Sequence, residues 1–134
     1  AGGEAGSESS INYVKNGIAG MLENVPREKL IGGVPFYTRL WTEAGDGTIT
    51  SKAMGIAEEK RCVDNNQVEL TWQADTAQYY GEVQTSDGAQ FLWMEEERSL
   101  KEKMNVIRQN DLAGVACWKL GFEDSAAWDS IQWN

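Results

Sequence analysis

The sequence of 134 residues contains no histidine. A serine–histidine triad, a histidine-ligated zinc site and histidine acid/base catalysis are therefore excluded within this chain, and acid/base work would fall to carboxylates, tyrosine or lysine. Cysteine is almost as scarce. Cys62 and Cys117 lie far apart and form no metal-binding pattern, and two cysteines neither require nor forbid a disulfide. We expect no metal and no cofactor.

The sequence also lacks long apolar runs, a signal peptide and a phosphate-binding loop. No stretch is long enough to span a membrane, and the pair Gly32-Gly33 alone is no nucleotide-binding fingerprint. Lys and Arg number 12 against 21 Asp and Glu, which gives a net charge of −9. A chain this acidic is a poor partner for nucleic acid or an anionic membrane, and we expect it to bind neither.

The composition that remains is typical of one globular domain, with 41% hydrophobic and 25% charged residues. The content of 6 Trp is high for this length. Tryptophans at this density serve either as stacking platforms for sugars or as core side chains. The chain starts AGGEAGSESS without an initiator methionine, so we expect a segment of a longer protein, with residues 1–8 flexible.

The stretch at residues 29–41 combines an apolar run with a cluster of rings and a cation. Leu30–Val34, bounded by glycine and proline, predicts a buried strand, and Phe36, Tyr37 and Arg39 follow its carboxyl end. In α/β folds ligands bind at that end of a strand. Aromatic faces beside a guanidinium suit a hydroxylated ligand such as a sugar, but the pattern alone favours rings that pack in a core.

Apolar periodicity, caps and turn residues predict the other elements. Four helices are expected: one at 11–22 capped by Ser9 or Ser10, one opening at Thr50 or Ser51 with Glu58–Arg61 on its solvent-exposed face, one opened by a Ser99–Glu102 capping box, and a last one capped by Asp124 or Ser125. The expected strands are at 68–72, 78–85, 89–94 and 114–118. Residues 68–94 read as an antiparallel meander. The buried strands at 30–34 and 114–118, separated by a crossover, are expected to be parallel neighbours.

Two features of this pattern suggest chemistry. Three adjacent acids, Glu95–Glu97, follow the meander directly. Paired carboxylates cleave glycosidic bonds in many hydrolases, but acids in front of a helix also stabilise the positive end of its dipole. Trp118 ends the second buried strand, as Phe36 and Tyr37 follow the first. These rings either face one pocket or fill the core, and the sequence leaves both interpretations open.

Four segments carry a resemblance to a known family. Residues 25–41 (VPREKLIGGVPFYTRLW) and 114–131 (GVACWKLGFEDSAAWDSI) resemble the seventh-strand region and the eighth strand with the final helix of family 18 glycoside hydrolases, the chitinase-like barrels. Residues 91–107 (FLWMEEERSLKEKMNVI) resemble the exit from an inserted α+β subdomain, and residues 5–18 (AGSESSINYVKNGI) resemble the stretch after the sixth strand. The most similar branch is that of bacterial spore cortex and cell-wall lytic enzymes.

The resemblance implies an α/β fold. It would be a partial TIM (β/α)8 barrel made of the last two βα units, with an inserted small α+β subdomain. The implied divisions are residues 1–49 with the first helix and barrel strand seven, residues 50–96 with the α+β insertion and its meander, and residues 97–134 with the crossover helix, barrel strand eight and the final helix.

The resemblance implies no catalytic residue in this chain. The family's Asp-x-x-Asp-x-Asp-x-Glu signature does not occur, and its sixth-strand Tyr-Asp element would precede residue 1. The implied substrate-binding residues are Trp118 as the floor beneath the sugar, Phe36, Tyr37 and Arg39 in the cleft wall, and the acidic pair Glu95 and Glu96. Thr38 stands where many members have glycine, which affects the local backbone and the width of the cleft.

The implied function is that of the carboxy-terminal part of a retaining glycoside hydrolase acting on N-acetylglucosamine-containing glycans, peptidoglycan more than chitin. This chain alone is expected to be inactive. The alternatives are a catalytically inactive, chitinase-like lectin and a folding unit whose rings only fill a core. The family implies an extracellular, cell-wall or spore-associated location. Two barrel strands without neighbours would expose their edges, so we expect self-association or coverage of the edges by the insertion.

Overall fold

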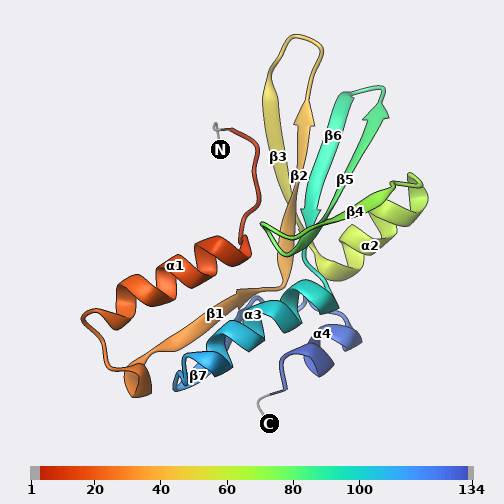
Figure 1. The fold of residues 1–134 in the computed structure, drawn as a ribbon. Helices are drawn as coiled ribbons and strands as arrows, with labels where there is room; N and C mark the ends of the chain where they lie inside the picture. The colour runs from red at the N-terminus through yellow and green to blue at the C-terminus, as the bar shows by residue number, and fades with distance from the viewer. Residues whose placement is uncertain (1–3, 133–134) are drawn as a thin grey trace.

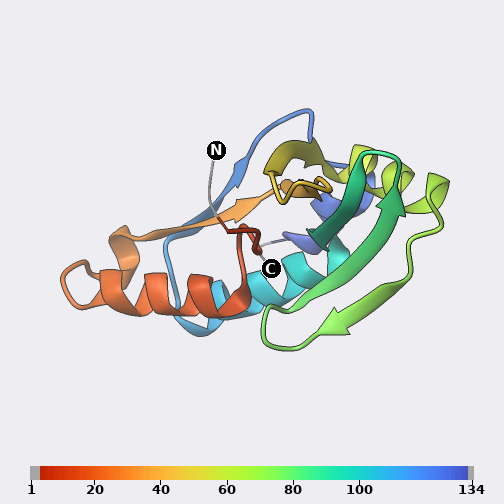
Figure 2. The same ribbon diagram turned by 90° about the horizontal axis from the view of Figure 1, so that it is seen from above.

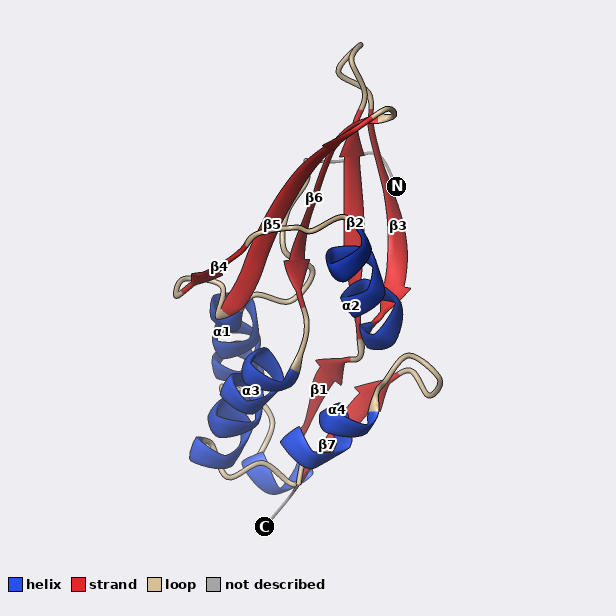
Figure 3. Cartoon of the chain, turned by 90° about the vertical axis from the view of Figure 1, so that its right-hand side faces the viewer, coloured by secondary structure: helices blue, strands red, loops and turns tan. Residues whose placement is uncertain are grey.

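The structure, a computed structural model, describes residues 4–132 and places their strands in two sheets. A two-stranded parallel sheet lies at one end of the molecule, and a five-stranded antiparallel sheet rises from it (Figure 1). Figure 3 shows the same division from the side, with the long antiparallel strands standing above the short parallel pair.

The parallel sheet consists of β1 (Ile31–Pro35) and β7 (Gly114–Trp118), paired so that Pro35 lies opposite Trp118. The predicted parallel pairing of these two strands is confirmed. Gly32 is required at its position, because a Cβ there would collide with the side chain of Ile107 on the covering helix. Because Pro35 and Trp118 are paired, the two strands end together, at the edge of the sheet where the predicted ring cluster lies.

Helices cover one face of the parallel sheet. They are α1 (Ile11–Leu22), which is followed by the short 3-10 turn η1 (Arg27–Lys29), then α3 (Glu97–Gln109) and α4 (Ser125–Ser130). Seen from above, β1 and β7 run along one side, and α1 and α3 along the other (Figure 2). The apolar faces of α1 and α3 pack against the strands and form the main core. Its buried residues include Ile11, Ile18, Val34, Phe36, Leu100, Met104 and Ile107.

The antiparallel sheet has the order β3-β2-β6-β5-β4. Its strands are β2 (Tyr37–Glu43), β3 (Ile49–Gly55), β4 (Leu70–Gln73), β5 (Gln78–Thr85) and β6 (Gly88–Met94). The helix α2 (Ile56–Asn65) packs on it through a second core formed by Val63, Val68, Leu92 and Met94. The predicted meander is confirmed as β4, β5 and β6. The limits 50–96 for the insertion stay a prediction, and the sheet itself takes in residues 37–94.

The prediction of a helix opening at Thr50 or Ser51 is wrong. Residues 49–55 form β3, which pairs with β2 over its whole length, and the helix begins only at Ile56. A weak apolar face of small side chains did not distinguish helix from strand, and the pairing with β2 decided the outcome. The prediction that Glu58–Arg61 form the solvent-exposed face of this helix is also partly wrong, since Glu59 is 0% exposed.

The helix caps agree with the sequence in two cases of three. Ser10 and Asp124 cap α1 and α4, as predicted. Ser99 does belong to a capping box, but as the third helical residue, and the cap itself is Glu96 rather than Ser99. Both cysteines are free thiols. No helix within residues 4–132 is long and apolar enough to cross a membrane.

Candidate functional site

A groove of about 440 Å³ lies at the carboxyl ends of β1 and β7. Both strands and the segment before α1 contribute to its walls. Its lining residues are Glu8, Ser9, Tyr13, Gly33, Val34, Pro35, Tyr37, Ala116, Cys117 and Trp118. Ligands bind at this end of parallel strands in α/β folds, so the groove occupies the position that the sequence predicted for a site.

Trp118 and Tyr37 are the two predicted residues that line this groove. Trp118 is the last residue of β7 and is 69% exposed, which leaves a ring face open to solvent. Tyr37 is half-buried at the start of β2. The peptide bond between Trp118 and Lys119 is cis. An exposed indole is a suitable stacking surface for the apolar face of a sugar ring.

Arg39 does not line the groove itself but pairs with Glu8, which does. Its Nε lies 2.8 Å from the Oε1 atom of Glu8, and both side chains are close to 30% exposed. Its NH1 group donates a hydrogen bond of 3.1 Å to the Ser51 hydroxyl on β3. Since the groove is lined by Glu8, the arginine holds a carboxylate at the mouth of the groove in place.

Phe36 lies beneath the groove rather than in its wall. The residue is 0% exposed, and its ring meets the Trp128 ring edge-on with a centroid distance of 5.3 Å. Its backbone amide donates to the carbonyl oxygen of Trp118 at 2.7 Å. Phe36 therefore couples the start of the antiparallel sheet to the end of β7. Thr38 is also buried, and its hydroxyl donates to the backbone carbonyl of Trp93.

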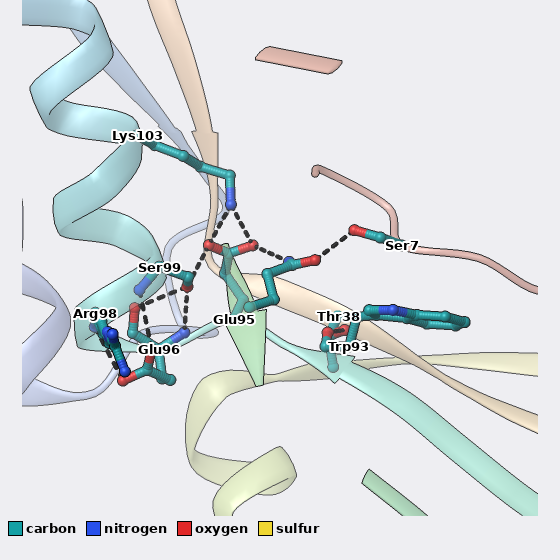
Figure 4. Close-up of polar contacts among 9 residues, drawn as sticks. Ser7, Thr38, Trp93, Glu95, Glu96, Arg98, Ser99 and Lys103 are labelled. Atoms are coloured by element: carbon teal, nitrogen blue, oxygen red, sulfur yellow. Dashed lines mark hydrogen bonds and ion pairs between the residues drawn. The ribbon is translucent and has the colours of Figure 1, made fainter. Parts of the chain in front are cut away.

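Glu95 lies at the junction of β6 and α3, away from the groove, and is 1% exposed. Lys103 Nζ contacts its two carboxylate oxygens at 2.8 and 3.0 Å, and the Ser99 hydroxyl donates at 2.7 Å. Gln78 Nε2 donates at 2.9 Å. Burial raises the pKa of Glu95, and the Lys103 charge opposes that rise. Figure 4 shows these groups converging on the carboxylate.

Glu96 acts on the helix that follows it. Its two carboxylate oxygens each accept a hydrogen bond of 2.9 Å, from the backbone amides of Ser99 and Arg98. The interpretation of the acidic run as a helix-stabilising feature therefore describes what this residue does in the structure. The remaining acid, Glu97, pairs with Lys60 at 2.8 Å.

Apart from residues of the two parallel strands, the groove contains three residues that were not identified from the sequence: Glu8, Ser9 and Tyr13. The first two fall in or next to a segment expected to be flexible. Tyr13 stands outside the apolar stripe of α1 and is 72% exposed. The sequence offered one signal that Tyr13 belongs to a site: a large ring on the polar face of a helix. As for metals, residues 4–132 contain no cluster of three or more potential ligands among His, Cys, Asp and Glu.

Comparison with known proteins gives consistent matches. The sequence profile of the family described as Glycosyl hydrolases family 18 matches residues 4–123. The chain is 25% identical over 131 residues to the "Uncharacterized glycosylase YvbX" of Bacillus subtilis (strain 168), covering 97% of this chain and 38% of that protein. It is 25% identical over 130 residues to the "Cortical fragment-lytic enzyme" of the same bacterium, covering 96% and 30%. The chain thus spans about a third of the length of these relatives.

A solved structure shows the same fold. The chitinase from Chromobacterium violaceum ATCC 12472 superposes with a TM-score of 0.87 at 20% identity, over 96% of this chain and 39% of that one. The predicted class, an α/β partial TIM barrel with an inserted α+β subdomain, is therefore confirmed, and the two parallel strands described here do not close a barrel by themselves. Because the profile covers most of the sequence, the resemblance found at residues 25–41 and 114–131 is confirmed as well: the chain belongs to the glycosyl hydrolases of family 18.

Proposed function

We propose that the chain forms one wall of the substrate cleft in a family 18 glycoside hydrolase that acts on N-acetylglucosamine-containing glycans, peptidoglycan more than chitin. One observation carries the proposal: Trp118 is 69% exposed at the end of β7, in a groove that also holds Tyr37 and Glu8. An open indole face beside a phenol and a carboxylate offers a sugar both a stacking surface and hydrogen-bond partners. The names of the two relatives and the chitinase support this substrate class.

The predicted binding residues take different parts in this proposal. Trp118 and Tyr37 contact the glycan, and Arg39 holds Glu8 toward it. Phe36 supports the floor from below, because its amide is bonded to the Trp118 carbonyl. Glu95 and Glu96 contribute indirectly, through the buried contacts described above.

The bond cleavage itself is proposed to depend on residues outside this chain. In family 18 the N-acetyl group of the substrate serves as nucleophile and the configuration is retained, in contrast to the usual pair of enzymatic carboxylates. The acidic signature that would supply the general acid does not occur among these 134 residues. We therefore propose that the chain is inactive alone and belongs to an extracellular, cell-wall or spore-associated hydrolase.

Two measurements test the proposal. The 134-residue chain is expected to release no chromophore from chromogenic N-acetylglucosaminides, and turnover would contradict the assignment of catalysis to other residues. N-acetylglucosamine oligomers are expected to change the tryptophan fluorescence of the wild-type chain. Trp118→Ala should abolish this response, whereas Leu120→Ala should retain it, because Leu120 is 75% exposed but does not line the groove. An undiminished response in Trp118→Ala would refute the groove as the binding site.

A further inference from the structure

The segment that precedes α1 is attached to the antiparallel sheet and not to the parallel pair. Trp41 Nε1 donates a hydrogen bond of 3.1 Å to the carbonyl oxygen of Gly6, and the Ser7 hydroxyl donates to Gln78 Oε1. The Glu8 carboxylate pairs with Arg39 at 2.8 Å. In Figure 1 this segment rises from α1 alongside β2 and β3. Three consecutive residues thus each make a contact with the sheet.

The contact at Ser7 is the outer end of a buried chain of polar groups. Gln78 is 1% exposed, and its Nε2 donates to Glu95 at 2.9 Å. Glu95 in turn accepts from Lys103, and both of these residues are 1% exposed. Figure 4 shows Lys103 above the Glu95 carboxylate and Ser7 to the right of it. The chain of contacts connects α3 to the segment before α1 across the interior.

The chemistry of these groups fixes the direction of every hydrogen bond. An ammonium only donates, so the carboxylate of Glu95 faces Lys103 as an acceptor. The amide of Gln78 must then turn its NH2 group toward Glu95, which leaves its carbonyl oxygen for Ser7. Ser7 can only be held as a donor. Because burial strengthens such a network and makes an unpaired member costly, the amide has one favourable orientation.

We propose that Lys103, Glu95, Gln78 and Ser7 form a positioning relay that holds residues 6–8 on the sheet and thereby places the Glu8 carboxylate at the mouth of the groove for a glycan. Arg39 contacts Oε1 of Glu8, and in this proposal Oε2 accepts a hydroxyl or amide proton from a sugar. A segment of glycine and small polar residues is mobile unless it is anchored. Anchoring it before the ligand arrives lowers the ordering cost of binding.

The relay deepens the proposed function and rests on it for the identity of the ligand. It makes Glu8 a binding residue and Ser7, Gln78 and Glu95 positioning residues. It also gives the buried acid of the β6–α3 junction a part in binding without any contact between Glu95 and the sugar.

Hydrogen exchange and glycan affinity of the 134-residue chain test the relay together. Ser7→Ala removes the last donor at the surface end, where a loss of folding is least expected. It should speed exchange of the Ile11 amide, which donates to the Thr76 carbonyl in the β4–β5 turn at 2.8 Å, and raise the Kd for N-acetylglucosamine oligomers by about five- to tenfold, the effect of one net hydrogen bond. Ser7→Thr, which keeps the hydroxyl, should restore both values. Ser86→Ala, an exposed serine in the β5–β6 turn, is the matched control and should change neither.

Two further variants separate the relay from the groove. Gln78→Met keeps the length of the side chain without its polar atoms and should reproduce the effects of Ser7→Ala. Glu8→Gln should raise the Kd while leaving exchange of the Ile11 amide within about twofold of wild type. Unchanged exchange in Ser7→Ala, or failure of Ser7→Thr to restore it, would overturn the relay. Absence of oligomer binding by the wild-type chain would instead overturn the proposed function, whatever the exchange data show.

Discussion

Glu59 provides the sharpest test of the energetics of this fold. It lies in the first half of α2, is 0% exposed, and neither of its carboxylate oxygens has a hydrogen-bond partner among the described residues. Burial raises its pKa well above the ordinary value of 4.5, and the charges of Glu95 and Glu96 add to the rise. The Glu95 backbone and the Lys60 charge oppose it. The folded chain therefore prefers the neutral acid at this position.

The expected consequence is a loss of stability as the pH rises. Above pH 4.5 the unfolded chain releases the Glu59 proton while the folded chain keeps it, so stability falls until the pH passes the folded pKa. Glu59→Gln cannot ionise and escapes this loss. The buried amide of the variant is as polar as the neutral acid, so the difference between the two proteins comes from ionisation. We therefore expect the advantage of Glu59→Gln over wild type to be larger at pH 8 than at pH 5, by about 1.4 kcal/mol for each pH unit over which the folded acid keeps its proton.

Urea unfolding at pH 5 and pH 8 measures this difference directly. For a chain of 134 residues, each 1 kcal/mol of difference corresponds to about 4 °C in melting temperature. Glu58→Gln is the matched control, because the Glu58 side chain is 42% exposed and pairs with Lys52 on the surface. It should change stability by less than about 1 kcal/mol at either pH. An advantage of Glu59→Gln that is equal at both pH values would refute the reasoning.

Three other predictions follow from buried or strained positions and from the free strand edges. Lys103→Met should destabilise the fold by about 3–5 kcal/mol in urea unfolding, because it leaves the Glu95 charge buried and unpaired; a loss below 1 kcal/mol would contradict this. Gly88→Ala should cost about 1–3 kcal/mol, since φ is +128° and a Cβ would meet the carbonyl oxygen of Glu43, whereas Gly45→Ala, with open space around it, should cost less in the same experiment. The chain is expected to self-associate through the free edges of β1 and β7, and a monodisperse monomer in light scattering at high concentration would contradict that expectation.

Much of the scaffold was predictable because its signals are local. Apolar residues three and four apart specify α1 and α3, and Asp87-Gly88 specifies the turn between β5 and β6. Leu30–Val34 is short, apolar and bounded by glycine and proline, so a buried strand was the natural interpretation. The two strand segments also carried the family resemblance, on which the prediction of Trp118 and Tyr37 as cleft residues rests.

The site was less predictable because neighbouring residues of one type have different environments. Phe36 and Tyr37 are adjacent rings, yet one is 0% exposed and the other lines the groove. Phe36 lies between β1 and β2, and the sequence did not reveal that a second strand starts at Tyr37. Glu8 was missed for another reason. Its place depends on Arg39 and on the Ser7–Gln78 contact, which join residues 31 and 71 positions apart.

The sequence by itself determined the helices with regular stripes, the buried parallel strands, the turn chemistry and the family, since each rests on spacing within a few residues. Only the tertiary structure decided that residues 49–55 are a strand, that Glu59 is buried without a hydrogen-bond partner among the described residues and that Glu8 and Ser9 line the groove. The physical reason is that these outcomes depend on pairing and burial between distant segments. Short stretches with weak periodicity fit several conformations equally well until the rest of the chain is in place.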